Sequence, residues 1–292
     1  MLHRTIAPRA LSVVSISIAL SACVPAPRAP VDLETVHARA VRFGLAGPRA
    51  TVCPGEPVKL DVLIDAVDAD GDLVMLRPHR RTFDDWIFDP RQLKVASPQG
   101  FFDGEGTFFP DPDVTKSVQT GFVLYTRAPN GPAFSVRFPP SYECTSTIGK
   151  DGAPGGRGPG FSVFVTWART PDYTKVLAAR AIGEYEGITL VAPGTPLVAR
   201  SRGGQGVGGG DGGDGGYVTV VTDERFDDLD RLVTADVRGG EGGPGTYDEI
   251  DAARGIEGFR GPPGKRGYKG VASFERGPVT HHFENLGAIV AY

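Results

Sequence analysis

Length, composition and charge exclude several classes of protein. The 292 residues carry a formal net charge of −4, from 35 acidic against 31 basic residues, and no basic block stands out, so we do not expect nucleic-acid binding. After residue 22 no apolar stretch approaches the length of a transmembrane helix, so we expect the rest of the chain to lie on one side of a membrane.

Residues 1–22 have the layout of a lipoprotein signal peptide. A short basic start precedes an apolar stretch that is too short to be a stable anchor, and Leu20-Ser21-Ala22-Cys23 follows. These four residues resemble the lipobox of bacterial lipoproteins. The resemblance implies cleavage before Cys23 and acylation (palmitate) of Cys23, and Val24 at the next position favours the outer membrane in that family. An ordinary secretory signal with a chance cysteine is the alternative.

The other cysteines predict a covalent link. Residues 23–38 form the lipidated tether, and its Pro-rich part at 24–30 lifts the body off the lipid surface. Cys53 and Cys144 remain, and an oxidising envelope predicts a disulfide between them. Two buried free thiols are the alternative.

Residues 39–200 have the pattern of a β-rich domain, and a short helical turn is expected within 32–43. One face of the strand expected at 58–67 is apolar, through Val58, Leu60, Val62 and Ile64. The turn that precedes this strand loosely resembles the entry to the second strand of bacterial immunoglobulin-like modules. The pattern predicts further strands at 121–126, 134–138, 161–167 and 174–193. We therefore expect a mainly β fold with a β-sandwich-like domain.

Aromatic residues surround one predicted hairpin. The pairs Phe101-Phe102 and Phe108-Phe109 flank the turn sequence DGEG at 103–106. Neighbours in a strand point to opposite faces, so one ring of each pair should be exposed. With Trp86, these rings are candidate ligand contacts that could stack on a sugar or pack on a partner, and ordinary core packing is the alternative.

Glycine recurs at every third position across 203–216, and again at 149–160, 239–245 and 255–270. A polyproline-II-type helix has three residues per turn, so this spacing leaves a bare edge that another backbone can approach. We expect 201–292 to be a Gly-rich region of polyproline- or polyglycine-II helices with interleaved short strands, with 149–160 as an insert of the same kind in the β domain. The run at 203–216 should be innermost.

Other structures are compatible with this spacing. A collagen triple helix needs three chains and more proline than 203–216 contains, and a flexible linker is the usual state of Gly-rich tracts. A compact bundle within one chain accounts best for several runs that share one period, and a homotrimer stays open. Between the runs, 224–233 has helix-like apolar spacing.

The order of these segments resembles Gly-rich, collagen-like bacterial surface proteins. A GGXGGX tract, a short hydrophobic strand, an acidic linker and a second GGXGGXG tract follow one another in the last third of the chain. The resemblance implies a structural role at an exposed or envelope location, and it implies no chemistry.

The sequence offers no motif for catalysis, a cofactor or a metal. Alternate carboxylates from Asp68 to Asp72 begin like a calcium loop, but Leu73 and His79 occupy the positions that need Gly and Glu. There is no C-x-x-C, and the adjacent His281 and His282 would point to opposite faces of a strand. We therefore expect neither an enzyme nor a metal or cofactor site.

These features predict a lipid-anchored protein of the cell envelope, at the outer membrane, with a structural or adhesive binding role. Its partners would be membrane lipid, through acylated Cys23, and another envelope protein or a polysaccharide. The alternative is an accessory protein or hydrolase acting on envelope polysaccharide. That alternative needs converging carboxylates, for which the candidates near Trp86 are Asp84, Asp85, Asp103 and Glu105.

Overall fold

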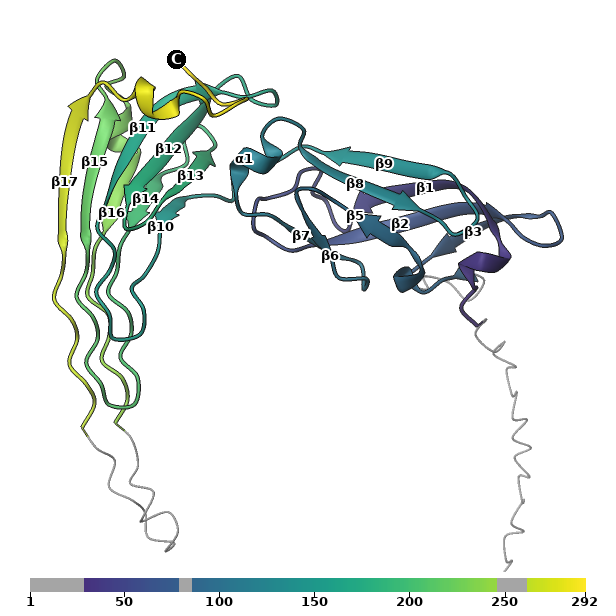
Figure 1. The fold of residues 1–292 in the computed structure, drawn as a ribbon, viewed down its shortest axis with the longest axis horizontal. Coiled ribbons are helices and arrows are strands. Elements are labelled where there is room, and N and C mark those ends of the chain that lie inside the picture. The colour runs from purple at the N-terminus through teal and green to yellow at the C-terminus, as the bar shows by residue number, and fades with distance from the viewer. Residues whose placement is uncertain (1–28, 79–85, 246–261) are drawn as a thin grey trace, which may run out of the picture.

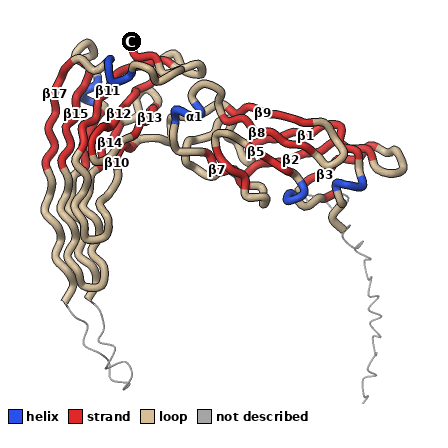
Figure 2. Tube along the Cα trace, in the orientation of Figure 1, coloured by secondary structure: helices blue, strands red, loops and turns tan. Residues whose placement is uncertain are grey.

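Strands make up most of the regular structure and form two units that follow one another along the chain. The structure is a computed structural model that describes residues 29–78, 86–245 and 262–292. Figure 1 shows the two units side by side, with long segments running away from the sheets of the second unit, and Figure 2 shows those segments as loop. The expected mainly β fold class is confirmed.

The first unit has two layers. One sheet has the order β4-β3-β2-β7-β6, with β1 also paired to β2, and the other has the order β5-β8-β9. The strands of the first sheet are β1 (His37–Leu45), β2 (Val58–Val67), β3 (Leu73–Arg77), β4 (Trp86–Ile87), β6 (Gly100–Phe102) and β7 (Thr107–Pro110). Those of the second are β5 (Lys94–Ala96), β8 (Phe122–Arg127) and β9 (Ala133–Phe138). Side chains of both sheets share one core, as Ile64, Phe108 and Phe122 illustrate.

Strand β2 has the alternation that its sequence predicts. Leu60, Val62 and Ile64 are buried, and Val58 is partly buried against the same core. The helical turn expected within 32–43 is the 3-10 helix η1 (Leu33–Thr35), where the Asp32 side chain accepts a hydrogen bond from the N–H of Glu34. The unit's other short helices are η2 (Pro90–Gln92) and α1 (Val114–Ser117).

The second unit also packs two sheets together. A three-stranded sheet has the order β10-β14-β16, and a six-stranded sheet has the order β13-β12-β11-β15-β17, with β18 paired to β11. The strands are β10 (Thr147–Gly149), β11 (Phe161–Arg169), β12 (Val176–Gly183), β13 (Gly187–Val191), β14 (Leu197–Arg200), β15 (Tyr217–Asp223), β16 (Val233–Asp236), β17 (Val271–Gly277) and β18 (Val290–Ala291). The inner faces meet in a core that includes Ile148, Val163 and Val220.

Each Gly-rich run connects the two sheets of this unit. Residues 150–160 join β10 to β11, residues 201–216 join β14 to β15, and the third connection joins β16 to β17. In the first two connections the chain leaves one sheet, turns, and returns to the other (Figure 1). We call residues 150–160, 201–216, 237–245 and 262–270 the Gly-rich bundle. The division expected at residue 200 therefore runs through both sheets, because β14 pairs with β16 and β11 pairs with β15.

A second core joins the two units. Val114 and Val118 of the α1 region pack with Leu190 of β13 and with Phe283 of the 3-10 helix η4 (Thr280–Phe283), on the outer face of the six-stranded sheet. The Cys53–Cys144 disulfide lies at the same junction, with Cα atoms 6.1 Å apart. The expected pairing of these two cysteines is confirmed.

Two local expectations are wrong. Residues 224–233 form turns around the three-residue 3-10 helix η3 (Leu229–Arg231), because Leu229 and Val233 bury themselves in the core between the sheets without a longer helix. His281 and His282 lie in η4 rather than on a strand, and their rings are 3.9 Å apart instead of on opposite faces.

Candidate functional site

The Gly-rich bundle is held by backbone hydrogen bonds that repeat every three residues. Gly152 and Gly155 donate to the carbonyl oxygens of Arg202 and Gln205, at 2.8 and 3.0 Å. On the other side of the same connection, Gly203 donates to Arg238 at 2.9 Å and Gly206 to Glu241 at 2.8 Å. Residues 201–216 thus lie between the other two connections, as the glycine spacing predicts.

A second set of bonds crosses between the outgoing and returning segments. Gly213 donates to Gly204, Gly240 donates to Gly213, and Gly267 donates to Gly240, with distances of 2.8, 2.8 and 2.9 Å. These glycines have no room for a side chain. A Cβ atom at Gly204 would lie 1.7 Å from the carbonyl oxygen of Ala153, and one at Gly213 would lie 1.8 Å from that of Gly156. Only hydrogen fits at these positions, so glycine is required for the close approach of the segments.

Most residues of the bundle that are not glycine are exposed or partly exposed, and many are charged, whereas Ser201 and Val237 at its base are buried. At its base, Asp236 accepts hydrogen bonds from both Arg238 and Arg202, and these bonds hold the pKa of the Asp236 carboxyl well below its usual value. Arg200 pairs with Asp151, and farther along Arg266 pairs with Glu241 at 3.4 Å. This face therefore interleaves cations and anions and has no strong charge of one sign.

The Asp236 cluster gives a pH-dependent prediction. Replacing Asp236 with Asn should lower the free energy of unfolding by about 1 kcal/mol at neutral pH, because the two arginines that it pairs with remain partly exposed. A carboxyl with a depressed folded pKa stabilises the fold above its unfolded pKa of about 3.9 and loses that effect as pH falls through the folded pKa. Urea unfolding should show the same difference between parent and variant at pH 7 and pH 5, and a smaller one at pH 3. A difference in unfolding free energy that grows at pH 3 would contradict a lowered pKa of the Asp236 carboxyl in the folded protein.

The aromatic hairpin forms as expected, with β6 and β7 paired antiparallel and Phe101 opposite Phe109. Phe101 is 62% exposed and stacks on Phe109 with ring centroids 4.6 Å apart, while Phe108 is fully buried and Phe102 packs against the core. Trp86 is partly buried against that same core. The structure thus leaves one exposed stack, Phe101 on Phe109, and assigns Phe102, Phe108 and Trp86 to core packing.

The carboxylates near this hairpin stabilise the hairpin itself. Asp103 accepts from the backbone N–H groups of Glu105 and Thr107, at 2.7 and 2.9 Å. Glu105 pairs with Arg91 at 2.9 Å, and both side chains are exposed. Asp84 and Asp85 lie outside the described residues. Asp103 and Glu105 thus make the contacts of a structural turn, with nothing in these contacts that resembles a pair of catalytic acids.

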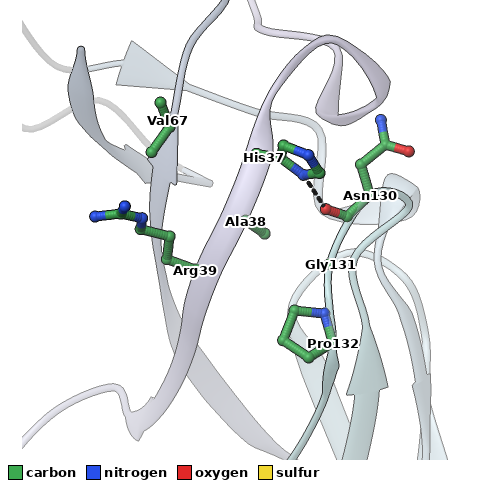
Figure 3. Close-up of a pocket in the computed structure, with 7 residues that line it drawn as sticks. All are labelled: His37, Ala38, Arg39, Val67, Asn130, Gly131 and Pro132. Carbon is green, nitrogen blue, oxygen red and sulfur yellow. Dashed lines mark hydrogen bonds between the residues drawn. The ribbon is translucent and has the colours of Figure 1, made fainter. Parts of the chain in front are cut away.

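Surface hollows offer little chemistry. One of about 710 Å³ lies beside the start of β1, where the His37 Nδ1 atom is 2.7 Å from the Asn130 carbonyl oxygen (Figure 3). Its lining includes Arg39 and Pro132 but no carboxylate, so it lacks a paired acid and base. A second, of about 520 Å³, lies between α1 and the strands β12 and β13, lined by Arg180 and Tyr185 among others.

The one group of candidate metal ligands among the described residues makes other bonds. Cys53, Glu56 and Cys144 come together, but the two sulfur atoms are bonded to each other and Glu56 pairs with Arg49 at 3.1 Å. Cys23, the predicted lipidation site, lies outside the described residues.

Among the described residues of the second unit, sequence reasoning missed the aromatic side chain that is most exposed. Tyr268 is 82% exposed and Tyr217 is 55% exposed, and both lie where a Gly-rich segment meets a strand. The signal was present, because Tyr217 follows Asp211 and Asp214 at intervals of three in GDGGDGGY, the outward phase of the repeat.

Comparison with known proteins gives no relative from which a function can be transferred. Across the described ranges, no helix is long and apolar enough to cross a membrane. No family model, curated protein or solved structure matches the chain.

Proposed function

We propose that this chain is a lipid-anchored protein of the cell envelope with a structural or adhesive binding role. Acylated Cys23 would hold it at the outer membrane, and the Gly-rich bundle would project from its second unit toward another envelope protein or a polysaccharide. The observation that carries the proposal is the hydrogen bonding of the bundle. Glycine N–H groups bond to carbonyl oxygens of neighbouring segments, which keeps a projection with few apolar side chains in one shape.

We infer further that the segments are polyglycine-II helices. The donors Gly212 and Gly215 are three residues apart, and so are their acceptors Lys265 and Tyr268. A step of three residues is one turn of such a helix, whereas bonds to one neighbouring β-strand recur every two residues. Exposure supports the inference, because Gly212, Gly213, Gly215 and Gly216 are buried while Asp211 and Asp214 are exposed.

The arrangement favours binding over catalysis. The bundle offers rigid, outward-pointing side chains with a regular spacing, which suits recognition of an extended partner. The hydrolase alternative gains no support from Asp103 and Glu105, since their contacts hold the hairpin turn and the adjacent Arg91.

Replacing Cys23 with Ala tests the anchor. The variant should move from the membrane pellet to the soluble fraction, because acyl chains on Cys23 add about 0.8 kcal/mol of membrane affinity per buried methylene. Fractionation with density separation of inner and outer membranes measures this, and acyl labelling should be lost in parallel. Ser21→Ala is the matched control, since alanine keeps a small residue in the lipobox. A Cys23→Ala protein that still sediments with membranes would exclude the proposed anchor.

A further inference from the structure

One face of the second unit is partly apolar and exposed. Val279, Phe283 and Ile289 cover the outer face of the six-stranded sheet only over its far part. Where β15 and β17 pass into the Gly-rich bundle, that cover ends. We call the open area the tyrosine face; its residues are Asp211, Asp214, Tyr217, Thr219, Lys265, Tyr268, Val271 and Ser273.

Hydrogen bonds and strand register align these residues in two columns. Asp211 and Asp214 accept, through Oδ1, from the N–H groups of Lys265 and Tyr268, both at 2.7 Å. Tyr217 is in register with Val271, and the Ser273 hydroxyl donates to the Thr219 hydroxyl at 3.1 Å. Register partners of a parallel pair point to the same side, so the columns share one face.

The spacing along each column is regular. Tyr268 precedes Val271 by three residues, and Asp214 precedes Tyr217 by three. At about 3.1 Å per residue, each interval is ~9 Å. The backbone that sets this spacing is fixed by bonds such as Gly215 N–H to the Tyr268 carbonyl, at 2.8 Å. The points at which these side chains leave the backbone are therefore fixed before any partner binds.

Exposure and charge indicate what such a partner would be. The apolar side chains of this surface are exposed to solvent, at 82% for Tyr268, 57% for Val271 and 55% for Tyr217. The carboxylates of Asp211 and Asp214 lie in one of the two columns, which disfavours a polyanion. Lys265 beside Asp211 disfavours a polycation. Arg157 lies over the Tyr217 ring, 5.5 Å from its centre, and is paired to Glu184 at 3.0 Å.

The face continues toward the hollow of about 520 Å³ at α1. Thr219 is in register with Ser162 of β11, and Ser162 is in register with Ile182 of β12, which lines that hollow. A row of hydroxyl groups thus connects the tyrosines with a recess that contains Tyr185 and Glu186. Candidate contacts that extend from the Gly-rich bundle across three strands fit a chain molecule better than a small one.

We propose that the tyrosine face binds a linear, uncharged polysaccharide. Sugar rings pack their C–H faces on Tyr217 and Tyr268, and sugar hydroxyls donate to Asp211 and Asp214 and bond to Thr219 and Ser273. The inference rests on the proposed binding role and names its partner class. It places the binding site on the second unit, whereas the sequence pointed to the aromatic hairpin of the first unit.

Native gel electrophoresis through gels that contain a polysaccharide tests this inference. The chain from residue 24 onward keeps every described residue and avoids acylation. Hydroxyethylcellulose and laminarin are the uncharged linear probes, and alginate is the anionic one. We expect at least one uncharged probe to retard the protein, and Tyr217→Ser with Tyr268→Ser to weaken that retardation by about tenfold or more in apparent Kd.

The matched control is Phe101→Ser with Tyr125→Ser, two exposed aromatic residues of the first unit at 62% and 51% exposure. This control should leave the retardation unchanged, and both double variants should have the melting temperature of the parent. Retardation by neither uncharged probe, stronger retardation by alginate, or a loss in the control instead of the tyrosine variant would each overturn the inference. The anchoring experiment is independent, so a membrane-bound protein without polysaccharide binding would reject this inference and leave the envelope proposal standing.

Discussion

Replacing Gly213 with Ala should disrupt the Gly-rich bundle and lower the free energy of unfolding by about 3 kcal/mol or more. A Cβ atom at Gly213 would lie 1.8 Å from the carbonyl oxygen of Gly156, and that neighbour is backbone, which cannot rotate away. The segments would have to separate. Gly213 also donates to Gly204 of the same connection and accepts from Gly240 of the next one, so a separation breaks hydrogen bonds within the central connection and between it and the third.

Gly160→Ala is the matched control. A Cβ atom there would first meet the Glu184 carboxylate, at 3.7 Å, which is an ordinary contact. Its free energy of unfolding should stay within about 0.5 kcal/mol of the parent. Urea unfolding measures the global effect, and hydrogen exchange of the amides in 201–216 measures the local one. If the amides of 201–216 are as well protected from exchange in the Gly213→Ala variant as in the Gly160→Ala variant, the segments are not packed as described.

Removing the Cys53–Cys144 disulfide should cost about 4 to 5 kcal/mol, the largest effect expected from a single bond in this chain. The two cysteines are 91 residues apart, and the chain-entropy model assigns that amount to a loop of this length. The bond also lies at the junction of the units, because Cys53 follows the bridge between Val52 and Pro140 and Cys144 precedes β10.

Cys53→Ser with Cys144→Ser, compared with the parent in a Cys23→Ala background, isolates this bond from the acyl chain. The urea midpoint should fall in the double variant, and dithiothreitol should lower the parent's midpoint to the same value without moving the variant's. Equal midpoints for parent and variant in the absence of reductant would show that packing between α1 and β13 holds the junction alone.

Several elements were predictable because they depend on residues close in sequence. The buried face of β2 follows from strict alternation through Leu60, Val62 and Ile64. The β6–β7 hairpin follows from DGEG between two phenylalanine pairs, and alternation requires that Phe101 and Phe108 point opposite ways. With Cys23 assigned to lipid, the pairing of Cys53 and Cys144 follows by counting. The three-residue glycine period likewise leaves one edge of each segment without side chains, which permits another backbone to approach closely.

Only the tertiary structure decided which distant segments meet. The sequence divides at residue 200 by composition, yet β14 pairs with β16 and β11 with β15, because each Gly-rich connection returns the chain to a strand that completes a shared core. Residues 224–233 have the spacing of a helix, but burial of Leu229 and Val233 needs only turns. The tyrosine face has the same origin, since Tyr217 and Tyr268 become neighbours only when the hydrogen bonds between segments fix their register. A local sequence pattern determines which side of a segment is buried or lacks side chains. Which other segment packs against that side is decided by the packing of the whole unit.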